Sequence, residues 1–273
     1  MPTRAEFKKY LDGLADHYES PAFIDADPIS IPHAFDDPRD QEVIGLYAAL
    51  LAWGRRTTIL NKLQDLCERM AYRPAAFVRN FDPVRDAALL EGFVHRTFQP
   101  ADAFWFTRNL SRLLQKHGSV EQIFARHLPS NAETVEAAIQ GFSTSIMRAH
   151  PETPHRLQKH LARPEAGSAC KRLAMYLRWM VRPGPVDFGL WSSISPEQLV
   201  LPLDVHVGRQ ARALGMVQRK SNDWKAVLSL TEKCRTLNPS DPARYDFAFF
   251  GVGAYDDSLD ERFTGENALP FTS

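Results

Sequence analysis

The sequence predicts an all-α protein. Apolar residues recur at steps of three and four along most of the chain, the spacing of amphipathic helices, and no series with the alternating period of β-strands interrupts them. Candidate helices begin after Asp or Ser and end at Gly or Pro. With 273 residues, 44% of them hydrophobic and 24% charged, the chain has the composition of a globular protein with a substantial core.

In the first half of the chain, a stripe of apolar residues from Phe7 to Tyr18 predicts the first helix. Asp37 and Pro38 then supply an N-cap and a first-turn proline for a helix that Gly54 ends. That helix is apolar on most sides, so we expect it to be central and buried. Further helices are predicted at residues 60–73, 102–117, 119–127 and 132–149.

The segment 150–170 breaks this pattern, because proline, glycine and basic residues occur together there. We interpret it as a basic connector into a helix over residues 171–181, with Ser168 as its cap and Pro183 as its stop. The remaining helices are predicted at residues 205–214, 222–236 and 242–252. The segment 257–273 is acidic and has few apolar residues, so we expect a flexible tail.

Several classes of protein are not expected from this composition. No apolar run approaches the roughly 18 residues of a membrane helix, and no secretory signal is present at the N-terminus, so we expect a cytoplasmic protein without a membrane partner. The three cysteines, Cys67, Cys170 and Cys234, are too dispersed for a disulfide framework or an iron–sulfur cluster. We expect neither a metal site nor a cofactor.

Charge is unevenly distributed although the net charge is zero, with 33 basic and 33 acidic residues. Residues 1–45 contain ten acids and four bases, whereas residues 148–182 contain eight bases and only Glu152 and Glu165 in opposition. Such a segment fits a face that follows a phosphate backbone, since each phosphate needs a nearby cation. The alternative is an ordinary solvated helix surface.

Three features that could take part in a reaction lie within residues 164–215. The segment PEAGSACKRL places a tight turn before a helix, and Lys171 lies in the first turn of that helix. The segment LDVHVGR places Asp204 at the start of the next helix. A cation is disfavoured near a helix N-terminus, which would help an amine to lose its proton and act as a nucleophile.

These features resemble the helix-hairpin-helix DNA glycosylases. In that superfamily a hairpin binds the DNA backbone, a lysine after it is the nucleophile of bifunctional members, and an aspartate in a similar motif opens the next helix. The 33 positions between Lys171 and Asp204 are similar to the spacing in archaeal 8-oxoguanine glycosylases. The segments LRWMVR and DPARYDFAFFG also resemble an uncharacterised bacterial family assigned to this superfamily.

The resemblance implies a two-lobed fold and a repair activity. Residues 42–200 would form a helical barrel with the hairpin, and residues 1–41 and 201–256 a second lobe. The cleft between the lobes would hold Lys171 as the amine and Asp204 as the catalytic carboxylate. The expected function is a DNA glycosylase with AP lyase activity that excises a damaged base, such as an oxidised purine. The protein would act as a monomer on double-stranded DNA with a damaged base or abasic site.

The same resemblance assigns further residues to the site. The expected DNA contacts are Gly167, Ser168, Arg172, Arg178, Arg182 and Arg209. The expected base pocket comprises Phe188, Trp191 and His206, because aromatic rings can stack on an extruded base.

Structural alternatives remain for each of these residues. Asp204 is also well placed as a helix N-cap, Lys171 as a surface lysine, and Phe188 and Trp191 as core residues. Two other functions also remain open at this stage. One is a non-catalytic DNA-binding module on the same scaffold, and the other is an all-α metal-dependent phosphohydrolase.

Overall fold

The computed structural model describes residues 2–25, 27–255 and 258–265, and these residues fold as helices without a strand. None of the described helices is both long and apolar enough to cross a membrane. The α-helices and the 3-10 helices (η) follow the order α1 (Arg4–Tyr18), η1 (Pro21–Phe23), α2 (Ser30–His33), α3 (Pro38–Leu51), α4 (Arg56–Arg69), α5 (Pro74–Arg79), α6 (Ala87–Leu90), α7 (Pro100–His117), α8 (Val120–Ala125), α9 (Glu136–Arg148), η2 (His155–His160), η3 (Pro164–Ala166), α10 (Lys171–Val181), η4 (Pro196–Gln198), α11 (Val205–Ala213), α12 (Trp224–Leu237), η5 (Pro242–Arg244), α13 (Tyr245–Ala254) and η6 (Glu261–Phe263).

The helix starts follow from short polar side chains that bind free backbone amides. Asp37 accepts a hydrogen bond from the Arg39 amide at the start of α3, as the sequence predicts. The start of α10 differs from the prediction, because Ser168 lies two residues too early to cap it. Its N-cap residue is Cys170, which has a left-handed backbone conformation (φ 51°) and caps no amide with its side chain.

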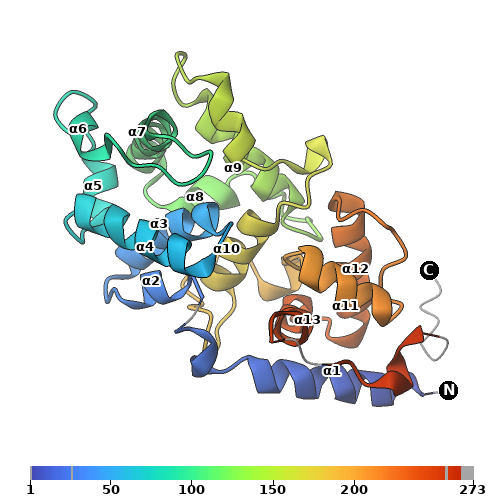
Figure 1. Ribbon diagram of the computed structural model, residues 1–273. Coiled ribbons are helices and arrows are strands. Elements are labelled where there is room, and N and C mark those ends of the chain that lie inside the picture. The colour runs from blue at the N-terminus through green and yellow to red at the C-terminus, as the bar shows by residue number, and fades with distance from the viewer. Residues whose placement is uncertain (1, 26, 256–257, 266–273) are drawn as a thin grey trace.

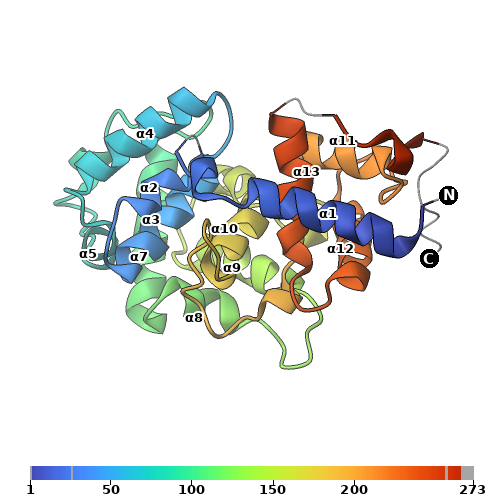
Figure 2. The same ribbon diagram turned by 90° about the horizontal axis from the view of Figure 1, so that it is seen from below.

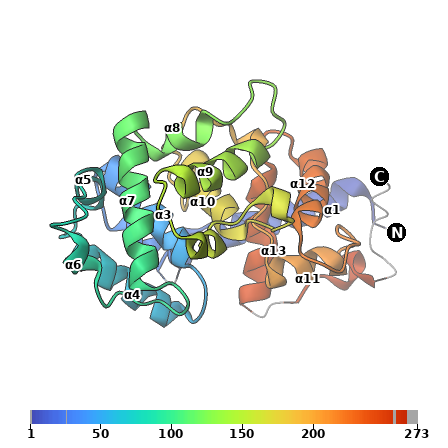
Figure 3. The same ribbon diagram turned by 90° about the horizontal axis from the view of Figure 1, so that it is seen from above.

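The helices gather in two groups on either side of α10 (Figure 1). Helices α2 to α8 lie on one side, where α3 is buried over most of its length and packs on α2, α5 and α10. Helices α11, α12 and α13 lie on the other side, and α1 runs along them (Figures 1 and 2). Seen from above, α9 and α10 separate α7 from α12 (Figure 3). Helix α10 therefore lies between the two groups.

The second group is closely packed around α13. Helix α1 crosses α13 at Gly251, where an added Cβ atom would collide with the Tyr18 ring. Helix α11 packs on another face of α13, where a Cβ atom at Gly253 would lie 3.0 Å from the His206 Cβ atom. Both glycines thus allow helix axes to approach more closely than larger residues would permit.

The segment from residue 257, expected to be a flexible tail, has packing contacts in the part that the structure describes. Residues 258–265 pack against α1, and Phe263 is only 2% exposed. The Phe263 ring stacks on Tyr10, with 4.8 Å between the ring centroids, and the Tyr10 hydroxyl accepts a hydrogen bond from the Asp260 amide. One buried aromatic residue therefore fixes a segment that is otherwise polar. Residues 257 and 266–273 of the predicted tail lie outside the described residues.

Candidate active site

Lys171 and Asp204 meet in space although 33 positions separate them in the sequence. Lys171 is the first residue of α10 and Asp204 is the N-cap residue of α11, and the Lys171 Nζ atom lies 3.3 Å from the Asp204 Oδ2 atom. Their side chains are 28% and 19% exposed. The pair is therefore partly desolvated but still accessible to solvent.

Asp204 performs two tasks with its two carboxylate oxygens. Its Oδ1 atom accepts hydrogen bonds from the amides of His206 and Val207, both at 2.9 Å, while Oδ2 faces Lys171. Its backbone carbonyl accepts a further hydrogen bond from Asn222, at 2.8 Å. Asp204 is thus the N-cap of α11, which was the structural alternative to a catalytic role, and its other oxygen atom contacts Lys171.

An aromatic residue of α13 completes the surroundings of the amine. The Lys171 Nζ atom lies 5.7 Å from the centre of the Phe250 ring, within range of a cation–π contact. The exposed His206 ring lies 6.3 Å from the same ring, and its Nδ1 atom is 3.0 Å from the Gly253 carbonyl oxygen. The structure thus gathers Lys171, Asp204, His206 and Phe250 around one point.

A buried ion-pair network lies behind this point. Arg178 pairs with Asp246 and with Asp187, and Arg182 pairs with Asp187, with 2.5 Å between Nη1 and Oδ2. Arg182 also contacts Asp241 at 2.8 Å. These arginines are 3% and 2% exposed. Their expected role as DNA contacts is therefore not supported by the structure, because acids from distant parts of the chain enclose both guanidinium groups.

Removing Arg178 should destabilise the protein rather than weaken its binding to a ligand. In Arg178→Ala, Asp187 and Asp246 stay buried but lose their shared partner, so we expect a loss of about 3–5 kcal/mol in the free energy of unfolding. Urea unfolding measures this loss. As a control, Arg209→Ala removes an exposed arginine and should change the free energy by less than about 0.5 kcal/mol. Equal effects of the two substitutions would contradict the structural role.

The comparison with known families covers both the site and the network. A family model described as a protein of unknown function, DUF2400, matches residues 27–255. The chain belongs to the DUF2400 family. No curated protein and no solved structure matches it significantly.

In this DUF2400 protein the predicted hairpin, residues 164–170, forms an exposed turn before α10. Gly167 has a φ of 76°, a conformation that favours glycine. Its carbonyl oxygen accepts a hydrogen bond from the Trp224 amide at 3.2 Å, and Ser168 pairs with Asp223 in an isolated antiparallel bridge. The start of α12 thus holds the turn in place, with Gly167 exposed and Ser168 half-buried.

Phe188 and Trp191 lie at the other end of α10 from Lys171. Their amides donate hydrogen bonds to the carbonyls of Trp179 and Met180, eight and nine residues after Lys171 and therefore about 12–14 Å further along the helix. The buried Trp191 indole donates to Glu42 at 3.0 Å, and the Phe188 ring stacks on His33. The geometry does not support their predicted place in a base pocket, because the loop after α10 folds back against the C-terminal half of that helix.

A second basic surface of the DUF2400 protein was missed at the sequence level. Arg55, Arg56 and Arg96 are exposed, and the Arg96 guanidinium lies 5.0 Å from the centre of the Trp53 ring. Arg172 lies 6.0 Å from the same ring and donates to the Leu50 carbonyl, and burial lowers the pKa of its guanidinium. The only sequence signal was the dipeptide Arg55-Arg56 after a buried helix. Among the predicted DNA contacts, Arg172 is thus half-buried beside this surface, whereas Arg209 is exposed on α11.

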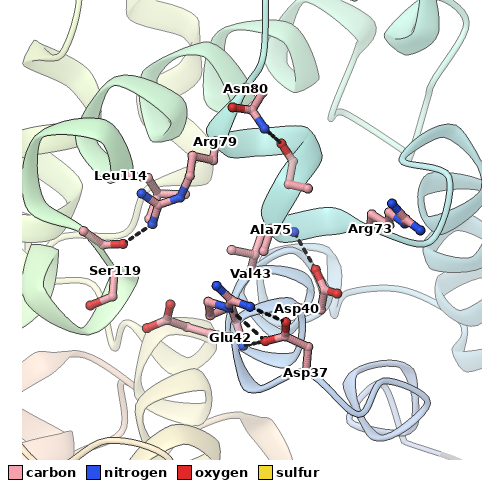
Figure 4. Close-up of a pocket in the computed structure, with 13 residues that line it drawn as sticks. Asp37, Asp40, Glu42, Val43, Arg73, Ala75, Arg79, Asn80, Leu114 and Ser119 are labelled. Atoms are coloured by element: carbon pink, nitrogen blue, oxygen red, sulfur yellow. Dashed lines mark hydrogen bonds and ion pairs between the residues drawn. The ribbon is translucent and has the colours of Figure 1, made fainter.

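A surface cavity of about 450 Å³ lies elsewhere, where α3 begins (Figure 4). Its lining includes arginines and acids that already bind protein groups: Arg39 pairs with Asp37, and Asp40 accepts a hydrogen bond from the Ala75 amide at 2.8 Å. Arg172 contacts the other end of α3, about 20 Å away along the helix. The cavity is therefore separate from the Lys171 site. Within the described residues, no group of three His, Cys, Asp or Glu side chains is arranged to hold a metal ion.

Proposed function

We propose that this protein is a DNA glycosylase with AP lyase activity, in which Lys171 is the nucleophile and Asp204 the catalytic carboxylate. The observation that carries the proposal is the 3.3 Å contact between these two side chains, which the sequence motifs single out independently. Its partner is double-stranded DNA that contains a damaged base or an abasic site. The partial exposure of both side chains supports a site that receives an extruded nucleotide.

The chemistry requires the two groups to act on the same sugar. As the N-glycosidic bond breaks, its electron pair leaves with the base, and positive charge develops on the sugar ring. The Asp204 carboxylate would stabilise that charge, as carboxylates do in glycoside hydrolysis. The neutral Lys171 amine would form a bond to C1′, and the proton that it loses would pass to the departing base. The C1′–O4′ bond then breaks and O4′ takes up a proton, which opens the sugar ring and leaves a Schiff base that allows β-elimination of the 3′ phosphate.

The fold proposed for this activity is the two-lobed helix-hairpin-helix glycosylase fold. The two groups of helices on either side of α10 support this interpretation (Figure 1). The hairpin at residues 164–170 and the N-terminus of α11 both lie beside Lys171. One boundary in the proposal shifts, because α1 packs on α13 whereas α2 packs on α3. Residues 30–41 therefore belong with the barrel rather than with the second lobe.

We further propose that the DNA backbone follows the exposed arginines around Trp53. Within the described residues Arg55, Arg56 and Arg96 form no ion pair, so their charges are available to phosphates. Arg172 follows Lys171 in the sequence, and its guanidinium group lies against the Trp53 ring of this surface. The hairpin, with exposed Gly167, would hold the backbone on the other side of the amine.

The double substitution Arg55→Ala/Arg56→Ala should weaken DNA binding without changing the fold. Each phosphate contact contributes about 0.9 to the slope of log affinity against log salt concentration, so the slope should fall in magnitude by about two. Fluorescence anisotropy with labelled duplex at several salt concentrations measures this. The matched control is Arg73→Ala/Arg112→Ala, which removes two other exposed arginines and should leave the slope unchanged. Equal slopes for both variants would place the DNA elsewhere.

Borohydride trapping tests the function itself. If the amine of the wild-type protein attacks an abasic site, the aldehyde loses water to give a Schiff base, and hydride reduces it to a stable covalent bond. We expect a protein–DNA adduct on a denaturing gel with duplex DNA that contains an abasic site. Salt-dependent binding without an adduct or base release would instead support the non-catalytic DNA-binding module. Absence of both binding and reaction would overturn the proposal.

A further inference from the structure

The carboxyl group of Asp246 in α13 lies buried behind the candidate site, and the proposed mechanism assigns it no role. Asp246 is 4% exposed, and its Oδ2 atom pairs with Arg178. Its Oδ1 atom is fully buried and has no hydrogen-bond partner in the described part of the protein. A buried acceptor left unpaired destabilises a fold, so such an atom calls for an explanation beyond the ion pair.

Helix geometry places this carboxyl group on the faces that meet at Lys171. Asp246 and Phe250 are four residues apart on α13, and Lys171 and Arg178 are seven residues apart on α10, so each pair shares one helix face. The two faces oppose each other, because Lys171 contacts Phe250 and Arg178 contacts Asp246. Asp246 is thus about one helical turn along α13 from the ring that the lysine amine contacts.

We propose that Asp246 is a positioning residue for Lys171, a buried carboxyl group that influences the charge on its amine from behind the site. The influence of Asp246 on Lys171 does not depend on the proposed function, but its effect on catalysis does. Asp204 would contact the reacting sugar, whereas Asp246 would act through Lys171 and never touch substrate.

Charged and titratable groups of several elements surround Asp246. They are Arg178 and Lys171 of α10, Asp187 of the following loop, Asp204 of α11 and Cys234 of α12. The buried Asp27 also interacts with Arg178 and Lys171. Burial is the largest influence and raises the pKa of Asp246 to about 6, with Asp204 and Asp187 acting in the same direction. Arg178 and Lys171 oppose this rise. In its charged form Asp246 attracts a nearby positive charge, which is the influence on Lys171 that the proposal assigns to it.

Chemical labelling of Lys171 tests this coupling without any DNA. We would measure the rate of reductive methylation of Lys171 by peptide mapping between pH 5 and pH 10. Asp246→Asn removes the charge but keeps the shape, so the amine should lose its proton at a lower pH, and its labelling below the midpoint should be about threefold faster. The matched control is Asp187→Asn, which also removes a buried acid from Arg178 but belongs to the loop after α10. Identical labelling profiles for the two variants would overturn the proposal.

A reciprocal measurement leaves the buried residue intact and so covers the case in which Asp246→Asn does not fold. The coupling between two groups acts equally in both directions. In Lys171→Ala, the carboxyl carbon of Asp246, observed by NMR with labelled aspartate, should therefore titrate at a higher pH than in the wild type. An unchanged titration would overturn the proposal by itself.

These results separate the further inference from the proposed function. If labelling and NMR show the coupling but borohydride trapping fails, Asp246 controls Lys171 in a protein that is not a glycosylase. If trapping succeeds, Asp246→Asn should also shift the pH profile of trapping to lower pH, which a purely structural ion pair would not do. If Asp246→Asn is trapped with the same pH profile as the wild type, the proposed glycosylase function stands and the role of Asp246 in its mechanism is wrong.

Discussion

Lys171→Ala should abolish the covalent adduct that borohydride traps between the wild-type protein and an abasic duplex. The substitution removes the amine that lies 3.3 Å from the Asp204 Oδ2 atom. Alanine is well tolerated in the first turn of a helix, so folding should be retained. The fraction of DNA shifted into the covalent band on a denaturing gel measures the effect, and we expect it to fall to background.

Two controls make this result specific. Lys225→Ala removes an exposed lysine near the start of α12 and should leave the adduct unchanged. Circular dichroism should show the same helix content in both variants. A strong adduct in Lys171→Ala would mean that another amine is the nucleophile, and the role of Lys171 would then be wrong.

Asp204→Asn should reduce base release by about a hundredfold or more while DNA binding persists. The substitution removes the negative charge that would stabilise the developing positive charge on the sugar. Asparagine caps helices about as well as aspartate, so the bonds to His206 and Val207 can persist, and the free energy of unfolding should change by less than about 1 kcal/mol. Single-turnover assays on duplexes with a panel of damaged bases measure the rate.

The matched control for this substitution is Asp223→Asn. Asp223 is the N-cap of α12 and accepts a hydrogen bond from the Ala226 amide, so it shares the capping role of Asp204 without contacting Lys171. Base release should be unaffected by it. If Asp204→Asn instead unfolds the protein and retains normal activity per folded molecule, Asp204 is a cap and the catalytic assignment fails.

Local sequence signals sufficed for most of the helices. The stripe from Phe7 to Tyr18 and the N-cap at Asp37 both appear in the structure as predicted. Helices α5 and α6 were not predicted, since they are six and four residues long and too short for a periodic pattern to develop. Their helical conformation depends on packing, as shown by the fully buried Val78 in α5.

The site was predictable only where its residues lie in motifs. Lys171 and Asp204 each mark a helix start and could be found from the sequence. Phe250 and Asp246 could not, because α13 is apolar on nearly all sides and its helical period does not reveal which face meets α10. The sequence drew notice to this helix only through the resemblance of the DPARYDFAFFG segment to a known family.

Two of the expected DNA contacts, Arg178 and Arg182, are buried in ion pairs. Arg178 pairs with Asp246 and Arg182 with Glu19, which are far away in the sequence, and both arginines pair with Asp187, which lies just beyond the basic segment 148–182. A count of nearby acids therefore made the basic segment seem more exposed than it is. Burial of an arginine depends on partners that no local window contains.

The close approach of Gly251 and Tyr18 joins α13 to a helix that lies outside the segment matched by the family. The segment shared with the DUF2400 family begins at residue 27, after α1 has ended, yet it includes α13, the helix that α1 covers. A chain trimmed to the shared segment would present the flank of α13 around Gly251 to water. In this protein the burial of that flank therefore depends on a helix that lies before the matched segment. The folded protein thus includes the first helix, whereas the segment shared with the DUF2400 family does not.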